Sequence, residues 1–236
     1  MPAGRPGVIA SPNIWRHPST YELERRCFDP DGLVDAALRS VADWTDRDVL
    51  DIGCGTGFEL PRFASSARSV VGVEPHDGLV KLARRRTSSL RSVHVVDGTA
   101  QALPLPDASV DIAHARWAYF FGPGCEPGLR ELDRVVRRGG TAFVVDNDGT
   151  RSTFGRWFLS GYPSIDPAAI ERFWSAHGWT RIPVLTELRC SSRADLEAVI
   201  GIEFDDATAT RIREEMATSA LDGVVDYAVN VFWRRF

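Results

Sequence analysis

Residues 49–57 read Val49-Leu50-Asp51-Ile52-Gly53-Cys54-Gly55-Thr56-Gly57, an apolar run that ends in three alternating glycines. A short apolar run that ends in glycines and precedes a helical pattern, here residues 58–64, is typical of a strand, a tight turn and a helix. Glycine lets the backbone take positive φ and lets a ligand approach without meeting a Cβ atom. The segment therefore predicts the first unit of an α/β sheet, with a ligand-binding loop after its strand.

The same alternation of short apolar runs and amphipathic stretches continues along the chain. Further strands are predicted at residues 69–74, 93–97, 110–115, 141–145, 181–188 and 224–232. Further helices are predicted at residues 32–44, 77–86, 127–136, 166–178, 193–200 and 207–220. The helix at 127–136 is expected to stop at Gly139-Gly140. Strands that alternate with helices in this way form a parallel sheet covered on both faces.

The first 30 residues differ from the rest of the chain because five prolines interrupt them, at positions 2, 6, 12, 18 and 30. Proline disrupts helix interiors, so residues 1–30 are predicted to form an irregular N-terminal arm with at most a short helix around 21–27. No linker divides the remainder. A chain of 236 residues suits one α/β domain, and residues 31–236 are expected to form it.

Composition restricts the possible partners and compartment. The formal net charge is −4, so no overall positive field attracts nucleic acid or an anionic membrane. The four cysteines show no metal-binding spacing, and no window approaches the ~18 apolar residues of a membrane span. We therefore expect a cytoplasmic protein with no metal and no nucleic-acid or membrane partner, whose oligomeric state is left open.

The polar residues around the glycine loop indicate what kind of ligand it holds. A helix N-terminus presents free N–H groups that suit a carboxylate, while Asp51 is placed to meet a cationic group. A ligand with both groups is an amino acid, and S-adenosylmethionine has such an end. Glu74 closes the next strand, where a carboxylate can accept hydrogen bonds from both ribose hydroxyls. Phe58 stands where the GxGxxG fingerprint of dinucleotide enzymes needs its third glycine.

Three further motifs follow the glycine loop in order: residues 71–74 (Val-Gly-Val-Glu), residues 98–107 (Gly-Thr-Ala-Gln-Ala-Leu-Pro-Leu-Pro-Asp) and residues 129–140 (Leu-Arg-Glu-Leu-Asp-Arg-Val-Val-Arg-Arg-Gly-Gly). With these four motifs the chain resembles the class I, Rossmann-like S-adenosylmethionine-dependent methyltransferases, particularly their small-molecule branch, over about residues 31–150. The resemblance implies a doubly wound, mostly parallel seven-stranded sheet with helices on both faces and an antiparallel last strand. It also implies methyl transfer from S-adenosylmethionine to a small-molecule acceptor.

The resemblance carries a set of cofactor-binding residues onto this chain. They are Asp51, Gly53, Cys54, Gly55, Gly57, Glu74, Gly98, Thr99, Ala100, Gln101, Ala115 and Arg116. Thr99 stands where the family commonly has the aspartate that accepts a hydrogen bond from the adenine amino group. A hydroxyl accepts that bond more weakly than a carboxylate, and Asp97 is an alternative acceptor two residues earlier.

No catalytic residue can be assigned, because a sulfonium methyl group is already activated and needs mainly an aligned acceptor. Side chains that could act as a general base are His17, Tyr21, Tyr119, Asp146 and Asp148. His17 and Tyr21 lie on the arm, which either closes as a lid or is a simple surface tether. Asp146 and Asp148 also fit a plain turn. His114 fits a packed strand position.

Aromatic residues gather after the fourth and fifth predicted strands: Trp117, Tyr119, Phe120, Phe121, Phe154, Trp157, Phe158 and Tyr162. They indicate either a pocket for an aromatic or apolar acceptor or ordinary core packing.

Other functions of the protein stay open as well. A non-catalytic S-adenosylmethionine-binding or regulatory protein would keep the same fold, an NAD-dependent oxidoreductase would share the sheet, and a nucleic-acid methyltransferase would need a basic domain.

Overall fold

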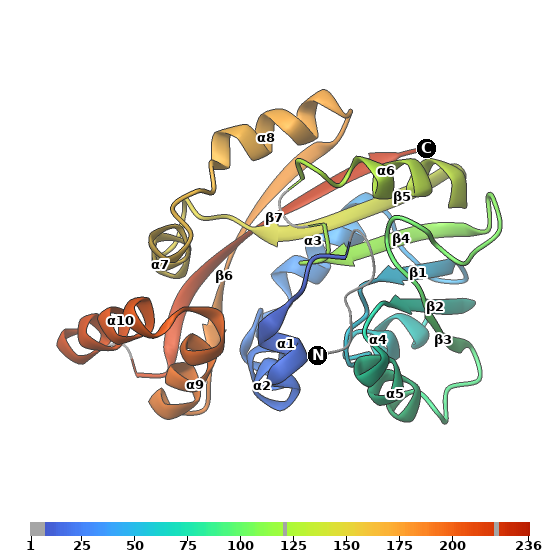
Figure 1. Ribbon diagram of the computed structural model, residues 1–236. Helices are drawn as coiled ribbons and strands as arrows, with labels where there is room; N and C mark the ends of the chain where they lie inside the picture. The colour runs from blue at the N-terminus through green and yellow to red at the C-terminus, as the bar shows by residue number, and fades with distance from the viewer. Residues whose placement is uncertain (1–7, 120–121, 220–221) are drawn as a thin grey trace.

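A computed structural model describes residues 8–119, 122–219 and 222–236 and contains one seven-stranded sheet (Figure 1). The strands are β1 (Asp48–Ile52), β2 (Ser69–Glu74), β3 (Val93–Asp97), β4 (Val110–Arg116), β5 (Val136–Asn147), β6 (Thr180–Arg189) and β7 (Val224–Arg235). Their order in the sheet is β3-β2-β1-β4-β5-β7-β6. β7 runs antiparallel to both of its neighbours, β5 and β6, and the other four strand pairs are parallel. The predicted doubly wound sheet with an antiparallel last strand is confirmed.

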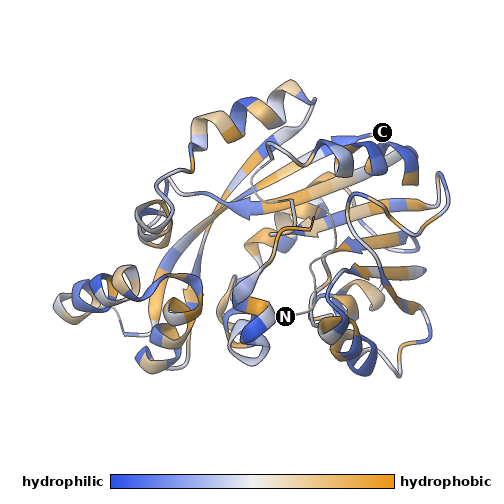
Figure 2. Ribbon diagram, viewed as in Figure 1, coloured by the Kyte–Doolittle hydropathy of each residue, from blue (hydrophilic) through white to orange (hydrophobic). Residues whose placement is uncertain are grey.

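Helices cover both faces of the sheet. They are α3 (Leu33–Val41), α4 (Leu60–Ala64), α5 (Asp77–Arg86), α6 (Glu126–Val135), α7 (Thr153–Gly161), α8 (Pro167–Ala176), α9 (Arg193–Glu203) and α10 (Asp206–Thr218). Buried residues of α6 and α8 share one hydrophobic cluster, whereas those of α3, α4, α5, α7, α9 and α10 belong to the other. Figure 2 shows hydrophobic residues along the central strands and mixed hydropathy on the helices, as expected for strands buried on both faces.

The arm is more helical than the sequence predicted. It forms α1 (Pro12–Arg16) and α2 (Pro18–Cys27), and each helix has its proline at the first helical position. The expectation of an irregular arm was wrong because proline at that position lacks only an N–H that would have no partner in the helix anyway. Such a proline begins a helix instead of breaking one.

Two other differences lie around β5. The predicted helix stop at Gly139-Gly140 is wrong: α6 ends at Val135, and β5 runs through both glycines. A Cβ on Gly140 would lie 2.7 Å from the backbone oxygen of Asp111, so glycine is required where β5 passes β4 at a register shift. Helix α7 was not predicted, although the Ser152 side chain caps it by accepting from the N–H of Gly155.

The chain folds outward in two directions from β1, toward β2 and β3 on one side and toward β4 and β5 on the other. In open α/β sheets, ligands bind beyond the carboxyl ends of the strands at such a reversal of strand order. Four parallel strands end there, at Ile52, Glu74, Arg116 and Asn147. None of the described helices is long and apolar enough to cross a membrane.

Candidate active site

A cavity of about 450 Å³ lies at this edge of the sheet, and the last residues of β1, β2, β4 and β5 line it. Its volume falls within the roughly 300–1,000 Å³ of small-molecule sites. Seven of the predicted cofactor residues line the cavity: Gly53, Glu74, Gly98, Thr99, Ala100, Gln101 and Arg116. The other five lie outside its lining: Asp51, Cys54, Gly55, Gly57 and Ala115.

The glycine loop after β1 is tied to the end of β2. The backbone N–H groups of Gly53 and Cys54 both donate to the carbonyl oxygen of Val73, at 2.8 and 3.1 Å. Gly53 has a φ of +69°, and a Cβ added to it would lie 2.8 Å from the Cβ of Ala118. The loop therefore needs glycine at position 53 both for its backbone conformation and for the close approach of the chain after β4.

Replacing Gly53 by alanine is expected to destabilise the protein more than the same change at Gly32. Both glycines have nearly the same positive φ, +69° and +70°, but nothing lies within 4 Å of a Cβ on Gly32. Left-handed strain of about 1–2 kcal/mol applies to both variants, whereas the clash with Ala118 adds about 1–3 kcal/mol only at Gly53. Urea denaturation of both variants measures this difference, and equal losses of unfolding free energy would contradict the tight contact.

Glu74 is buried at the end of β2, with 4% of its surface exposed, and it lines the cavity. One carboxylate oxygen accepts from the N–H of Gly55 and the other from the N–H of His76, each at 2.9 Å. Burial raises the pKa of Glu74 to about 7, although these two backbone donors act in the opposite direction. The two bonds fix the orientation of the carboxylate, which keeps further lone pairs for a ligand.

Asp51 does not line the cavity. It alternates with Leu50 and Ile52 along β1, and its side chain meets His114 of β4, with Oδ1 2.8 Å from Nδ1. Both side chains are buried, and the ring of Phe63 packs on His114 at 5.1 Å between ring centroids. Burial lowers the pKa of His114, while Asp51 acts against that shift. His114 is thus packed in the core, as expected, and the proposed contact of Asp51 with a cationic ligand group stays a prediction.

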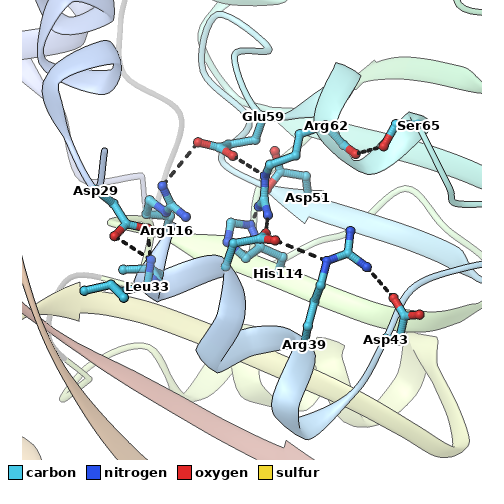
Figure 3. Close-up of polar contacts among 12 residues, drawn as sticks. Asp29, Leu33, Arg39, Asp43, Asp51, Glu59, Arg62, Ser65, His114 and Arg116 are labelled. Carbon is cyan, nitrogen blue, oxygen red and sulfur yellow. Dashed lines mark hydrogen bonds and ion pairs between the residues drawn. The ribbon is translucent and has the colours of Figure 1, made fainter. Parts of the chain in front are cut away.

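Arg116, at the end of β4, belongs to a buried ionic cluster centred on Glu59, as Figure 3 shows for Arg116 and Arg62. The carboxylate of Glu59 accepts from Arg25 at 2.6 Å, from Arg62 at 2.8 Å and from Arg116 at 3.2 Å. Burial opposes ionisation of Glu59, but the charges of Arg116 and Arg25 lower its pKa to about 2. The cluster joins the arm, through Arg25 of α2, to the end of β4.

The aromatic residues that the sequence grouped together separate into two sets. Trp117, Tyr119, Phe158 and Tyr162 line the cavity. Phe154 and Trp157 are instead buried in the core, where Phe154 stacks on Tyr227 at 4.3 Å between ring centroids. Phe120 and Phe121 lie outside the described residues. Core packing is therefore confirmed for Phe154 and Trp157, whereas a pocket for an aromatic or apolar acceptor stays a prediction for the residues that line the cavity.

Three of the five candidate general bases line the cavity: Tyr21, Tyr119 and Asp146. Burial raises the pKa of both tyrosines far above its usual value, so neither phenol ionises near neutral pH. His17 is exposed between α1 and α2. Asp148 is buried beside Arg181, with 3.0 Å between their charged groups, and does not line this cavity.

Sequence reasoning missed several residues that line the cavity, namely Ile14, Trp15, Glu24, Glu203 and Tyr227. The signal for Tyr227 was available in its alternation with Val225 and Val229 on β7, which places all three on one face. The residues of the arm and of α9 carried no comparable signal, because only the tertiary fold brings those helices to the cavity. Within the described ranges, no group of three His, Cys, Asp or Glu side chains is arranged to hold a metal ion.

Comparison with known proteins supports the same family. The sequence profile of a family described as "Methyltransferase domain" matches residues 50–144. A 2-phytyl-1,4-naphtoquinone methyltransferase of Synechococcus elongatus is 33% identical over 129 residues, which are 52% of this chain and 55% of that protein. An uncharacterised methyltransferase of Bacillus subtilis, YcgJ, is 32% identical over 104 residues, 43% of this chain and 41% of that protein. The chain thus matches about half of the length of these relatives.

Solved structures share the fold over most of the chain. The YcgJ crystal structure superposes with a TM-score of 0.63 at 16% identity and covers 86% of this chain and 97% of that one. A provisionally assigned methyltransferase from an antibiotic biosynthesis pathway of Anabaena variabilis also superposes with a TM-score of 0.63, at 20% identity, and the match covers 90% of this chain and 100% of that one. Residues 50–144 thus match a methyltransferase domain, and the strand order and superpositions show that the described chain shares the fold of solved methyltransferases.

Proposed function

We propose that this protein binds S-adenosylmethionine in the cavity at the carboxyl edge of the sheet and transfers its methyl group to a small molecule. The observation that carries the proposal is the buried, cavity-lining carboxylate of Glu74 at the end of β2. A carboxylate in that position can accept from both hydroxyls of an unmodified ribose. The NAD-type fingerprint is absent because position 58 is Phe58 instead of glycine.

The remaining cofactor contacts follow from the positions of the cavity-lining residues. We assign the adenine to the wall formed by Thr99, Ala100 and Gln101, since these residues follow β3 next to the Glu74 strand. The methionine end is assigned to the loop at Gly53 and to Arg116. Arg116 lines the cavity, and its guanidinium carries the positive charge that the carboxylate of the methionine end requires.

The other predicted cofactor residues act, on this proposal, by supporting the cavity wall. Gly55 gives its N–H to Glu74, and a Cβ on Gly55 would lie 2.8 Å from the Cδ1 atom of Ile14 in α1. Cys54, Gly57, Ala115 and Asp51 shape the loop and the strands beneath it. We further assign residues 1–30 to a lid, since Ile14, Trp15 and Tyr21 of the described arm form part of the cavity wall.

The chemistry demands little of the protein beyond positioning. S-adenosylmethionine supplies a methyl group that is already activated by the sulfonium. The chain's own residues hold the two reactants in line and keep water out. Trp117, Phe158 and Tyr162 cover the part of the cavity that the cofactor contacts leave, which favours an acceptor with aromatic or apolar surface. A quinone methyltransferase among the relatives agrees with such an acceptor.

Calorimetric titration tests the cofactor assignment. We expect the protein to bind S-adenosylmethionine and its demethylated product with one site per chain and to bind NAD far more weakly. Binding of NAD in the absence of binding by either sulfur compound would overturn the proposal. A panel of small molecules, assayed for release of the demethylated product, then tests methyl transfer itself. Binding without turnover on any acceptor class would support a regulatory protein instead.

A further inference from the structure

Two glutamates from distant parts of the sequence meet in the cavity wall. Glu24 comes from the arm helix α2 and Glu203 from the end of α9, and these two helices pack together. Burial and the neighbouring charge of Glu203 raise the pKa of Glu24, so the two carboxyl groups interact directly. The side-chain amide of Asn13 donates to Glu203, with Nδ2 2.6 Å from Oε1. The pair therefore joins α1, α2 and α9 at the cavity.

Glu24 is only 2% exposed, and its Oε2 atom has no hydrogen-bond partner among the described residues. Burying a carboxyl oxygen without a donor costs free energy, and placing a second carboxyl beside it adds repulsion when both ionise. The charge of Arg25 relieves only part of this cost, because Arg25 donates its hydrogen bond to Glu59 at 2.6 Å and burial still raises the pKa of Glu24. A glutamine at either position would keep one hydrogen bond between the helices without the like-charge pair. The arrangement is thus unfavourable for stability alone.

The surroundings of the pair favour a cation as the missing donor. Aromatic rings of Tyr21, Tyr162 and Tyr227 line the same cavity. Ring faces attract organic cations, and an ammonium group offers several N–H donors to two carboxylates at once. Burial raises the pKa of both glutamates, which means that the site opposes two negative charges and that a bound ammonium group would offset them. A neutral hydroxyl would provide one donor and no charge.

We propose that Glu24 and Glu203 recognise an ammonium group of the methyl acceptor, so that the acceptor is a small organic amine. This inference rests on the proposed methyltransferase function, because it concerns the part of the same cavity that the cofactor contacts leave. Recognition by charge-assisted hydrogen bonds predicts a strong preference for an amine over the alcohol of the same shape.

Titration of amine and alcohol pairs tests this preference. The protein, saturated with the demethylated cofactor, is titrated with 2-phenylethylamine, tyramine and tryptamine and with the alcohols that carry a hydroxyl in place of each amino group. At least one amine is expected to bind about tenfold or more tightly than its alcohol, and Glu203→Gln or Glu24→Gln should remove that difference. Equal binding of amine and alcohol, or no binding by any of the amines at millimolar concentration, would overturn the inference.

Thermal unfolding separates recognition from a structural role. If Glu24 and Glu203 serve to bind a ligand, Glu24→Gln should raise the melting temperature of the ligand-free protein, because it removes a buried carboxyl that lies beside another carboxyl. If the pair only fastens the helices, the variant should melt at a lower temperature and leave the amine preference unchanged, which contradicts the inference. Glu214→Gln, an exposed change on α10, serves as the control for charge removal. Failure of cofactor binding would count against the proposed function, whereas cofactor binding without an amine preference would count against this inference alone.

Discussion

Replacing Glu59 by glutamine is expected to lower the free energy of unfolding by about 3–5 kcal/mol, the cost of breaking a buried ion pair. The carboxylate of Glu59 pairs with both Arg25 and Arg116, whose side chains are 7% and 9% exposed. A neutral amide leaves these two buried cations without their carboxylate, and they repel each other. Denaturant unfolding monitored by fluorescence measures the loss.

Glu197→Gln is the matched control, because Glu197 pairs with Arg193 on the surface of α9, where both side chains are about one third exposed. The expected loss of unfolding free energy for this control is about 0.3–0.5 kcal/mol.

The loss of unfolding free energy caused by Glu59→Gln should also depend on pH. Folding lowers the pKa of Glu59 from its usual 4.5 to about 2, so its contribution is complete above pH 4.5 and disappears as the pH falls through about 2. A Glu59 variant as stable as the control would show that the cluster does not stabilise the fold.

The sheet was predictable because each of its strands is a local pattern. Short apolar runs that end in polar or glycine residues gave all seven strands, and the family motifs gave the antiparallel position of the last one. The wrong predictions of secondary structure also come from local signals, namely single prolines and glycines whose effect depends on their position. Pro12 and Pro18 were interpreted as helix breakers although they begin helices, and Gly139 was interpreted as a helix stop although it lies within a strand.

The cavity was predictable only in part, because motifs mark the strand ends and not the elements that fold over them. Glu74, Thr99 and Arg116 end or follow strands, and the structure brings them to one cavity. Asp51 belongs to the same motif but does not line the cavity, because its carboxylate contacts His114 in the core. Glu24 and Glu203 are 179 positions apart, and no local sequence pattern predicts that α2 packs on α9.

Glu74→Gln is expected to weaken binding of the demethylated cofactor by about 10- to 100-fold, which corresponds to 1.5–3 kcal/mol for two charge-assisted hydrogen bonds. The amide keeps one acceptor oxygen but turns its NH₂ group toward either Gly55 or His76, whose N–H groups both donate to the native carboxylate. The variant therefore loses the ribose contact together with one bond that orients the glycine loop. Isothermal titration calorimetry at pH 8 measures the change.

Asp97→Asn provides the control, since Asp97 pairs with Glu74 in the register of β2 and β3 but is exposed and lies outside the cavity lining. Weaker binding by this variant would mean that Asp97, and not Thr99, holds the adenine.

The pH dependence of cofactor affinity gives a second measurement of the role of Glu74. The pKa of Glu74 is about 7 in the free protein, and ribose hydroxyls donate to the ionised form, so native affinity should fall as the pH drops below 7. Affinity of Glu74→Gln should stay constant over that range, and a native affinity equally constant would place the ribose on another residue.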